Sequence, residues 1–178
     1  MLLKTPESIL WISENNGSFK KNFLKEFSML GIPSERIIFT KYLNSMGGEH
    51  LKRYGLADLF LDTLPFNAHT TAVDTLKAGV PTLTLPGKSF ASRVGSSLLT
   101  AVNLPELISP NQESYEALAI ELAHHPDKLA EIKQKLIRKL LNAPLFDTPL
   151  FTTHRELACE QMYQRYQNDL LPDYIAIN

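Results

Sequence analysis

The stretch that decides the fold runs from Ala57 to Gly79 and reads ADLFLDTLPFNAHTTAVDTLKAG. The short apolar run at 59–61 ends at Asp62 and predicts a buried strand. A turn with Pro and Asn follows, and residues 70–78 then have the apolar spacing of a helix, which ends near Gly79. A strand, a turn and a helix in this order predict one half of a βαβ unit.

The same alternation of short apolar runs and helical patterns extends on both sides of this stretch. It predicts a parallel sheet with helices on both faces, the Rossmann-like α/β class. We expect one domain over residues 1–178, with the last helices, within 111–168, packed on it. The further predicted strands are 9–12, 37–40, 82–85 and 107–108, and the further predicted helices include 19–30, 48–54, 89–102 and 153–168.

Composition excludes several classes of protein. The net charge of -1 argues against general nucleic-acid binding, which needs a surplus of Lys and Arg. The single cysteine, Cys159, excludes an intrachain disulfide and a CxxC site. No run approaches the ~18 apolar residues of a membrane span, and the N-terminal stretch lacks the apolar core of a signal peptide. We therefore expect a cytoplasmic protein with neither nucleic acid nor membrane as partner.

The segment with the clearest chemistry is the predicted helix start after Asp62. In open α/β sheets, ligands bind outside the carboxyl ends of the strands. A helix N-terminus attracts phosphate through free N–H groups and the helix dipole, and Thr70 and Thr71 would add two hydroxyl donors. His69 could donate to a phosphate oxygen, and Asp74 could accept from ribose hydroxyls. The alternative is that Asn67, Thr70 and Thr71 are ordinary helix caps.

Several separated motifs, in order along nearly the whole chain, resemble glycosyltransferase family 41, the O-GlcNAc transferase family. One such motif is weak evidence, whereas a series in the right order is specific. The main motifs are LADLFLDT (Leu56–Thr63), NAHTTAVD (Asn67–Asp74), AGVPTLTLPG (Ala78–Gly87), FASRVGSSLL (Phe90–Leu99) and ELISPNQESYEALA (Glu106–Ala119).

This resemblance implies a GT-B fold, in which two Rossmann-like lobes hold a sugar nucleotide between them. The chain resembles the C-terminal lobe. Three groups of residues are then expected to bind UDP: His69, Thr70 and Thr71 at the diphosphate, Asp74 at the ribose, and His50 and Arg53 by the uracil. Without the resemblance, His50 and Arg53 would be interpreted as part of a solvated helix face.

The resemblance also defines a candidate donor-sugar pocket at Phe66 and Asn67. Phe66 stands where a smaller residue is expected near the N-acetyl group, so another UDP-hexose is an open alternative. Gly47 stands where the family has a lysine, and the family's diphosphate-contacting lysine is expected upstream of this chain. Arg93 is expected either near the cleft or in a structural pair with a carboxylate.

The implied reaction is inverting transfer of a UDP-linked hexose to a Ser or Thr hydroxyl. The absence of a D-x-D motif fits metal-independent chemistry with no cofactor. The protein or peptide acceptor is expected to bind through an N-terminal lobe and upstream helical repeats of about 34 residues. No catalytic residue is assigned within the chain, which we expect to be inactive alone. The alternatives are a non-catalytic scaffold, favoured by Gly47, and one lobe of a GT-B-type sugar-nucleotide epimerase.

Overall fold

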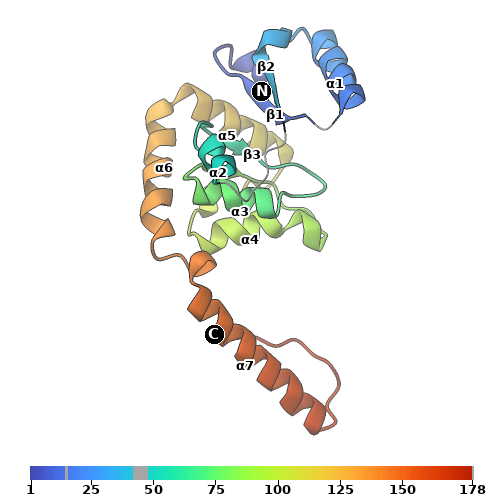
Figure 1. Cartoon of the computed structure of the whole chain (residues 1–178), viewed down its shortest axis with the longest axis vertical. Coiled ribbons are helices and arrows are strands. Elements are labelled where there is room, and N and C mark those ends of the chain that lie inside the picture. Colours follow the sequence, from blue (N-terminus) through green and yellow to red (C-terminus); the bar gives the residue numbers. More distant parts are fainter. Residues whose placement is uncertain (15, 42–47, 178) are drawn as a thin grey trace.

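The computed structural model describes residues 1–14, 16–41 and 48–177. Its N-terminal part is a β–α–β unit, shown in blue in Figure 1. β1 (Leu10–Ser13) pairs in parallel with β2 (Ile37–Thr40), and α1 (Gly17–Met29) lies between them in the chain. The helix begins at Asn16, whose Oδ1 accepts a hydrogen bond from the Phe19 amide over 2.8 Å. The rings of α1 pack against β2, with Phe23 perpendicular to Phe39 at 5.9 Å.

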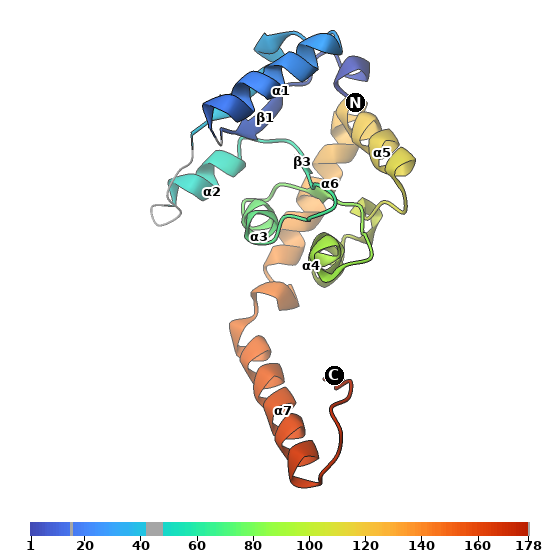
Figure 2. The same cartoon turned by 90° about the vertical axis from the view of Figure 1, so that its right-hand side faces the viewer.

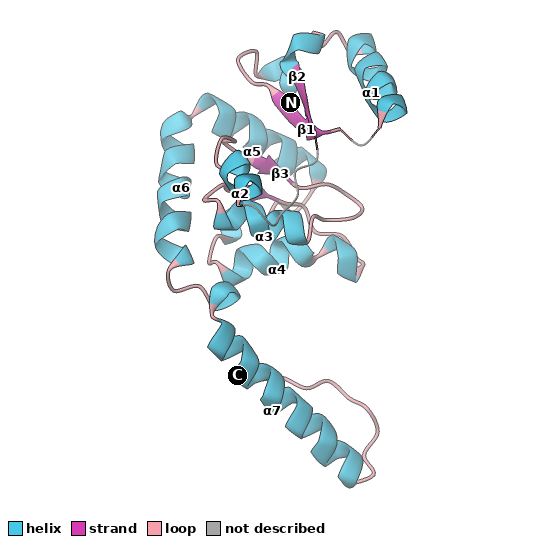
Figure 3. Ribbon diagram, in the orientation of Figure 1, coloured by secondary structure: helices cyan, strands magenta, loops and turns pink. Residues whose placement is uncertain are grey.

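A second parallel pair lies at the centre of the molecule (Figures 1 and 3). β3 (Phe60–Leu61) pairs with β4 (Thr82–Leu83), and a parallel bridge from Thr84 to Ile108 adds a third chain segment. The helices of this part of the fold are α2 (Glu49–Tyr54), α3 (Thr70–Lys77) and α4 (Val94–Ala101). The Rossmann-like α/β expectation is confirmed, and so is the strand–turn–helix order of 57–79.

The single sheet that we expected is divided into these two parallel pairs. β3 and β4 are shorter than the predicted strands, at two residues each. Pro81 and Pro86 flank the β4 region, and proline has no N–H to add to a ladder. The backbone of Asp62 continues the pairing by donating to the Leu83 carbonyl over 3.0 Å, and there the chain turns into the loop before α3.

The main core lies between α3, α4, α5 (Gln112–His124) and α6 (Pro126–Leu140). The apolar stripe of α6 is buried at Leu129, Ile132 and Leu136. A smaller cluster under α1 joins the N-terminal turn η1 (Leu2–Lys4) to the β1–β2 pair. The same turn is tied to α5, because His124 Nε2 lies 2.8 Å from the Lys4 carbonyl oxygen.

The last helix, α7 (Thr148–Gln167), differs from our expectation that the helices of 111–168 pack on the lobe. α5 and α6 do pack there, whereas α7 has no buried residue and extends away from the body of the molecule (Figures 1 and 2). Its apolar residues do not gather on one face, so it has no stripe to bury. It begins at 148 and not 153, because Asp147 accepts from the Leu150 amide over 2.9 Å and caps it. Among the helices that the structure describes, none has both the length and the apolarity to cross a membrane.

Candidate functional site

A buried carboxylate, that of Asp62, organises the loop between β3 and α3. Its Oδ1 accepts hydrogen bonds from the amides of Thr63, over 2.9 Å, and Ala68, over 2.6 Å. Its Oδ2 accepts from the Thr84 hydroxyl over 2.6 Å, which joins the loop to the segment after β4. Charge-assisted bonds of this kind are stronger than neutral ones. The loop that leads into α3 is therefore fixed at both ends.

Asn67 completes this framework from the middle of the loop. Its side chain is fully buried; Nδ2 donates to the Thr63 carbonyl over 3.1 Å, and Oδ1 accepts from the Gly95 amide over 3.3 Å. Its backbone amide donates to the Ala91 carbonyl over 2.9 Å. We expected Asn67 to line a donor-sugar pocket, but its amide faces the protein interior because it holds two loops together. It supports the loop that carries Phe66.

The N-terminus of α3 lies directly after this fixed loop. His69 is its N-cap residue, and no side chain caps the helix. Thr70 is exposed and Thr71 half-buried, both in the first turn. The interpretation of Asn67, Thr70 and Thr71 as caps of this helix is therefore disfavoured. The first N–H groups of a helix have no intrahelical partner, so an uncapped start is suited to an anion.

A second group of polar residues lies one turn further along α3, against α2. His50 Nε2 is 3.4 Å from Asp74 Oδ2, so the structure brings these two predicted residues together. Arg53 donates through Nη1 to the Lys41 carbonyl over 2.7 Å and thereby joins α2 to the end of β2. Both His50 and Asp74 keep part of their surface exposed, at 12% and 21%.

Tyr54 belongs to this group, although sequence reasoning missed it. Its ring is perpendicular to that of His50 at 4.6 Å and lies 5.9 Å from the Arg53 guanidinium carbon. Burial raises the pKa of Tyr54 above its ordinary value, and this effect exceeds the opposite effect of the Arg53 charge. The hydroxyl therefore stays protonated at neutral pH. The spacing of four residues from His50 in a predicted helix was the available signal.

Aromatic side chains border the other side of the α3 N-terminus. Phe66 stacks on His69 with 4.8 Å between ring centroids, and Phe90 meets the same imidazole edge-on at 6.3 Å. The helix expected over 89–102 is interrupted here: a short turn, η4 (Phe90–Ser92), precedes α4 and presents Phe90 outward. Phe90 was not predicted as a site residue.

Arg93, at the junction of η4 and α4, is exposed. Within residues 1–14, 16–41 and 48–177 it forms no ion pair, which disfavours the structural pairing that we considered. The same described residues contain no cluster of His, Cys, Asp and Glu suited to a metal. Gly47 lies outside the described residues.

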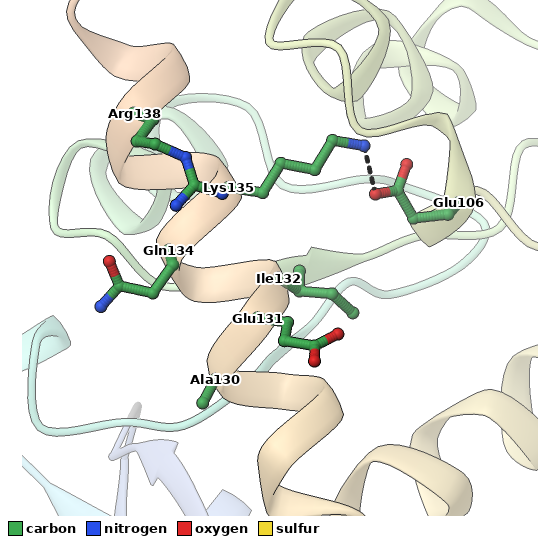
Figure 4. A pocket seen from close by; sticks show the side chains of 7 residues that line it. All are labelled: Glu106, Ala130, Glu131, Ile132, Gln134, Lys135 and Arg138. Carbon is green, nitrogen blue, oxygen red and sulfur yellow. Dashed lines mark hydrogen bonds and ion pairs between the residues drawn. The ribbon is translucent and has the colours of Figure 1, made fainter.

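Two surface hollows lie away from these residues. One, of about 620 Å³, lies between α6 and the turn at Glu106, where Lys135 forms an ion pair with Glu106 at 2.6 Å (Figure 4). The other, of about 380 Å³, lies between the C-terminal ends of α2 and α3 and the helix α6. The second hollow is at the C-terminal end of α3, opposite the threonines, and no residue of the candidate site lines either hollow.

Parallel strands with a helix N-terminus at their carboxyl edge define the chain as a Rossmann-like lobe. In open sheets of this class, ligands bind at that edge. The model of the glycosyl transferase family 41 matches residues 1–155. The chain belongs to glycosyltransferase family 41.

The relatives agree with this assignment. A UDP-N-acetylglucosamine–peptide N-acetylglucosaminyltransferase of Caenorhabditis elegans is 33% identical over 100% of this chain and 15% of its own length. A probable enzyme of the same name from Arabidopsis thaliana, SEC, is 34% identical over 99% of this chain and 18% of its own length. A solved mutant O-GlcNAc transferase of Thermobaculum terrenum superposes with a TM-score of 0.84 and 30% identity, over 91% of this chain and 31% of that one. The chain thus spans a small part of its curated relatives.

Proposed function

We propose that this chain is the UDP-sugar-binding lobe of a protein O-glycosyltransferase, with the diphosphate at the N-terminus of α3. The observation that carries the proposal is the uncapped helix start at Thr70 and Thr71, held by the Asp62 framework. Membership of family 41 and the names of the relatives support a UDP-linked sugar as donor and a peptide as acceptor.

The geometry suggests how the parts of the donor are distributed. The diphosphate accepts from the amides and hydroxyls of Thr70 and Thr71, and from His69 beside them. Asp74 holds the ribose, and its bond to His50 couples the ribose position to the uracil position. Arg53, fixed on the Lys41 carbonyl, lies on the uracil side. The sugar then points toward Phe66.

In the transfer step, a Ser or Thr hydroxyl of the acceptor attacks the anomeric carbon and gives up its proton to a base or to water, while the bond from that carbon to the diphosphate breaks. Negative charge develops on the leaving UDP. A preorganised helix N-terminus stabilises such charge without reorganising, and the fixed loop positions the donor. The acceptor, the metal-independent chemistry and the cytoplasmic setting stay predictions, as does the inactivity of the isolated chain.

Calorimetric titration with UDP tests the proposal. We expect saturable binding by the chain and a loss of affinity of about tenfold or more in the Thr70→Ala/Thr71→Ala double variant, because two donors to a charged acceptor are removed. The matched control is Thr152→Ala/Thr153→Ala, a pair of adjacent threonines on α7 that are both exposed. Equal UDP affinity in the two double variants would contradict the proposed site. An absence of UDP binding by the folded wild-type chain would favour the scaffold alternative.

A further inference from the structure

Two large aromatic rings remain exposed at the candidate site. Phe66 is 63% exposed and Phe90 78% exposed, and both contact the imidazole of His69. Scattered exposed apolar residues are ordinary. These two, however, come from different loops and meet at one polar residue, beside the uncapped start of α3.

The turn that presents Phe90 is built rigidly. Ser89 and Ser92 form a reciprocal capping box around it, and the Gly87 amide donates to the Ser92 carbonyl over 2.8 Å. A Cβ at Gly87 would come closer than 3.0 Å to the Ser92 side chain, so the close approach of these two segments requires glycine. Phe90 is therefore held in place by its own turn.

The two loops are also joined to each other next to the rings. The Ala91 carbonyl, adjacent to Phe90, accepts from the Asn67 amide over 2.9 Å and lies 3.5 Å from His69 Nε2. Phe66 and Phe90 thus keep a fixed relation to His69. We call these two exposed rings, Phe66 and Phe90, the aromatic edge. Because it is preorganised, it loses little conformational entropy when a ligand covers it.

The position of the edge indicates which part of a ligand would cover it. His50 and Asp74 lie further along α3, on the side of α2, and the proposed function places the nucleoside there. The aromatic edge is at the start of α3, on the side of η4. If the diphosphate is at Thr70 and Thr71, the group beyond the second phosphate reaches the aromatic edge. That group is the sugar.

We infer that Phe90 is a specificity-determining residue that forms, with Phe66, an apolar wall against the pyranose ring of the UDP-sugar. This rests on the proposed function. A pyranose presents C–H groups on its faces, and these pack against an aromatic face while the hydroxyls stay hydrogen-bonded elsewhere. The wall favours a sugar-bearing nucleotide over free UDP and disfavours groups without an apolar face.

The test compares the affinities of the chain for UDP and UDP-N-acetylglucosamine by saturation-transfer NMR titration. The Phe90→Ala variant should bind UDP-N-acetylglucosamine about three- to tenfold more weakly, the range of an aromatic packing contact, and bind UDP as the wild type does. Phe66→Ala should behave in the same way. The matched control is Phe151→Ala, because Phe151 is also 63% exposed but lies on α7.

The outcomes separate this inference from the proposed function. If wild type and Phe90→Ala bind UDP-N-acetylglucosamine with equal affinity and both still bind UDP, the role of Phe90 is overturned and the proposed function stands. Equal weakening of UDP and UDP-N-acetylglucosamine would also overturn it, because the ring would then act on the whole site. An absence of saturation transfer to both ligands in the wild type would remove the proposed function and the wall with it. The expected result is saturation transfer to the sugar protons that weakens only in the Phe66 and Phe90 variants, while transfer to UDP is unchanged.

Discussion

Replacement of Gly95 by alanine tests the framework that positions the site. Gly95 is buried at the start of α4, and its amide donates to Asn67 Oδ1. A Cβ there would come closer than 3.0 Å to both the Asp62 carboxylate and the Thr84 hydroxyl. These groups cannot both move away easily, because they are hydrogen-bonded to each other over 2.6 Å and Asp62 also holds the loop amides.

Two effects of the Gly95→Ala substitution lower the free energy of unfolding, and one raises it. Overpacking of a buried site costs about 1–3 kcal/mol, and disruption of a hydrogen bond to a charged group about 1.5–3 kcal/mol. Alanine gains at most about 1 kcal/mol of helix propensity over glycine. We therefore expect Gly95→Ala to lower the free energy of unfolding by about 1.5–5 kcal/mol, a large part of the ~5–15 kcal/mol typical of a domain.

Urea denaturation followed by circular dichroism measures this change. The control is Gly17→Ala, also in the first turn of a helix, where nothing lies within 4 Å of the added Cβ. We expect the control to leave the free energy of unfolding unchanged or to raise it by up to about 1 kcal/mol. Equal unfolding free energies for Gly95→Ala and wild type would show that the Asp62 framework is not close-packed around Gly95.

Three further predictions concern the same framework and the last helix. Thr84→Val, which keeps the shape but removes the donor to Asp62, should lower the free energy of unfolding by about 2 kcal/mol, measured by urea denaturation. Tyr115 donates to the Asp62 carbonyl, and burial, reinforced by the Asp62 charge, raises the pKa of its phenol. The contribution of Tyr115 to the free energy of unfolding is therefore complete below the ordinary tyrosine pKa of about 10 and is lost as the pH rises beyond it. Because phenylalanine does not titrate, Tyr115→Phe should flatten the fall of stability at alkaline pH. A chain that ends at Asp147 should keep its unfolding free energy within about 1 kcal/mol, because no residue of α7 is buried.

Each of these predictions has a contradicting result. For the Thr84 variant it is a change below about 0.5 kcal/mol, the range of ordinary surface substitutions. For Tyr115→Phe it is an alkaline profile that runs parallel to that of the wild type. For the shortened chain it is a clear loss of stability, which would mean that α7 packs on the body in solution.

Sequence patterns predicted the helices and strands where local signals are strong. The strand that ends at Asp62 and the helix that starts at Thr70 are present, since apolar spacing and turn residues determine them locally. The break at Arg93 was missed because the Ser89–Ser92 capping box resembles the start of one continuous helix. The division of the sheet depends on long-range pairing, which local patterns do not encode.

The candidate site was predictable only in part for the same reason. The spacing of His50 and Asp74 in two different helices gave no sign that they would meet, and only the resemblance to family 41 linked them. We assigned Asn67 to a pocket because the sequence shows that its side chain is polar, but does not show that this side chain is completely buried. Phe90 was missed because its importance arises from contact with His69 across two loops.

Amide NMR of the ¹⁵N-labelled chain during titration with UDP shows whether the start of α3 binds the diphosphate. We predict saturable shifts, largest at the amides of Thr70, Thr71 and Ala72, because a phosphate that accepts from these N–H groups changes their environment first. The His50–Asp74 region should shift at the same UDP concentrations. UDP-dependent shifts that saturate elsewhere in the described chain, with these three amides unaffected, would contradict the account.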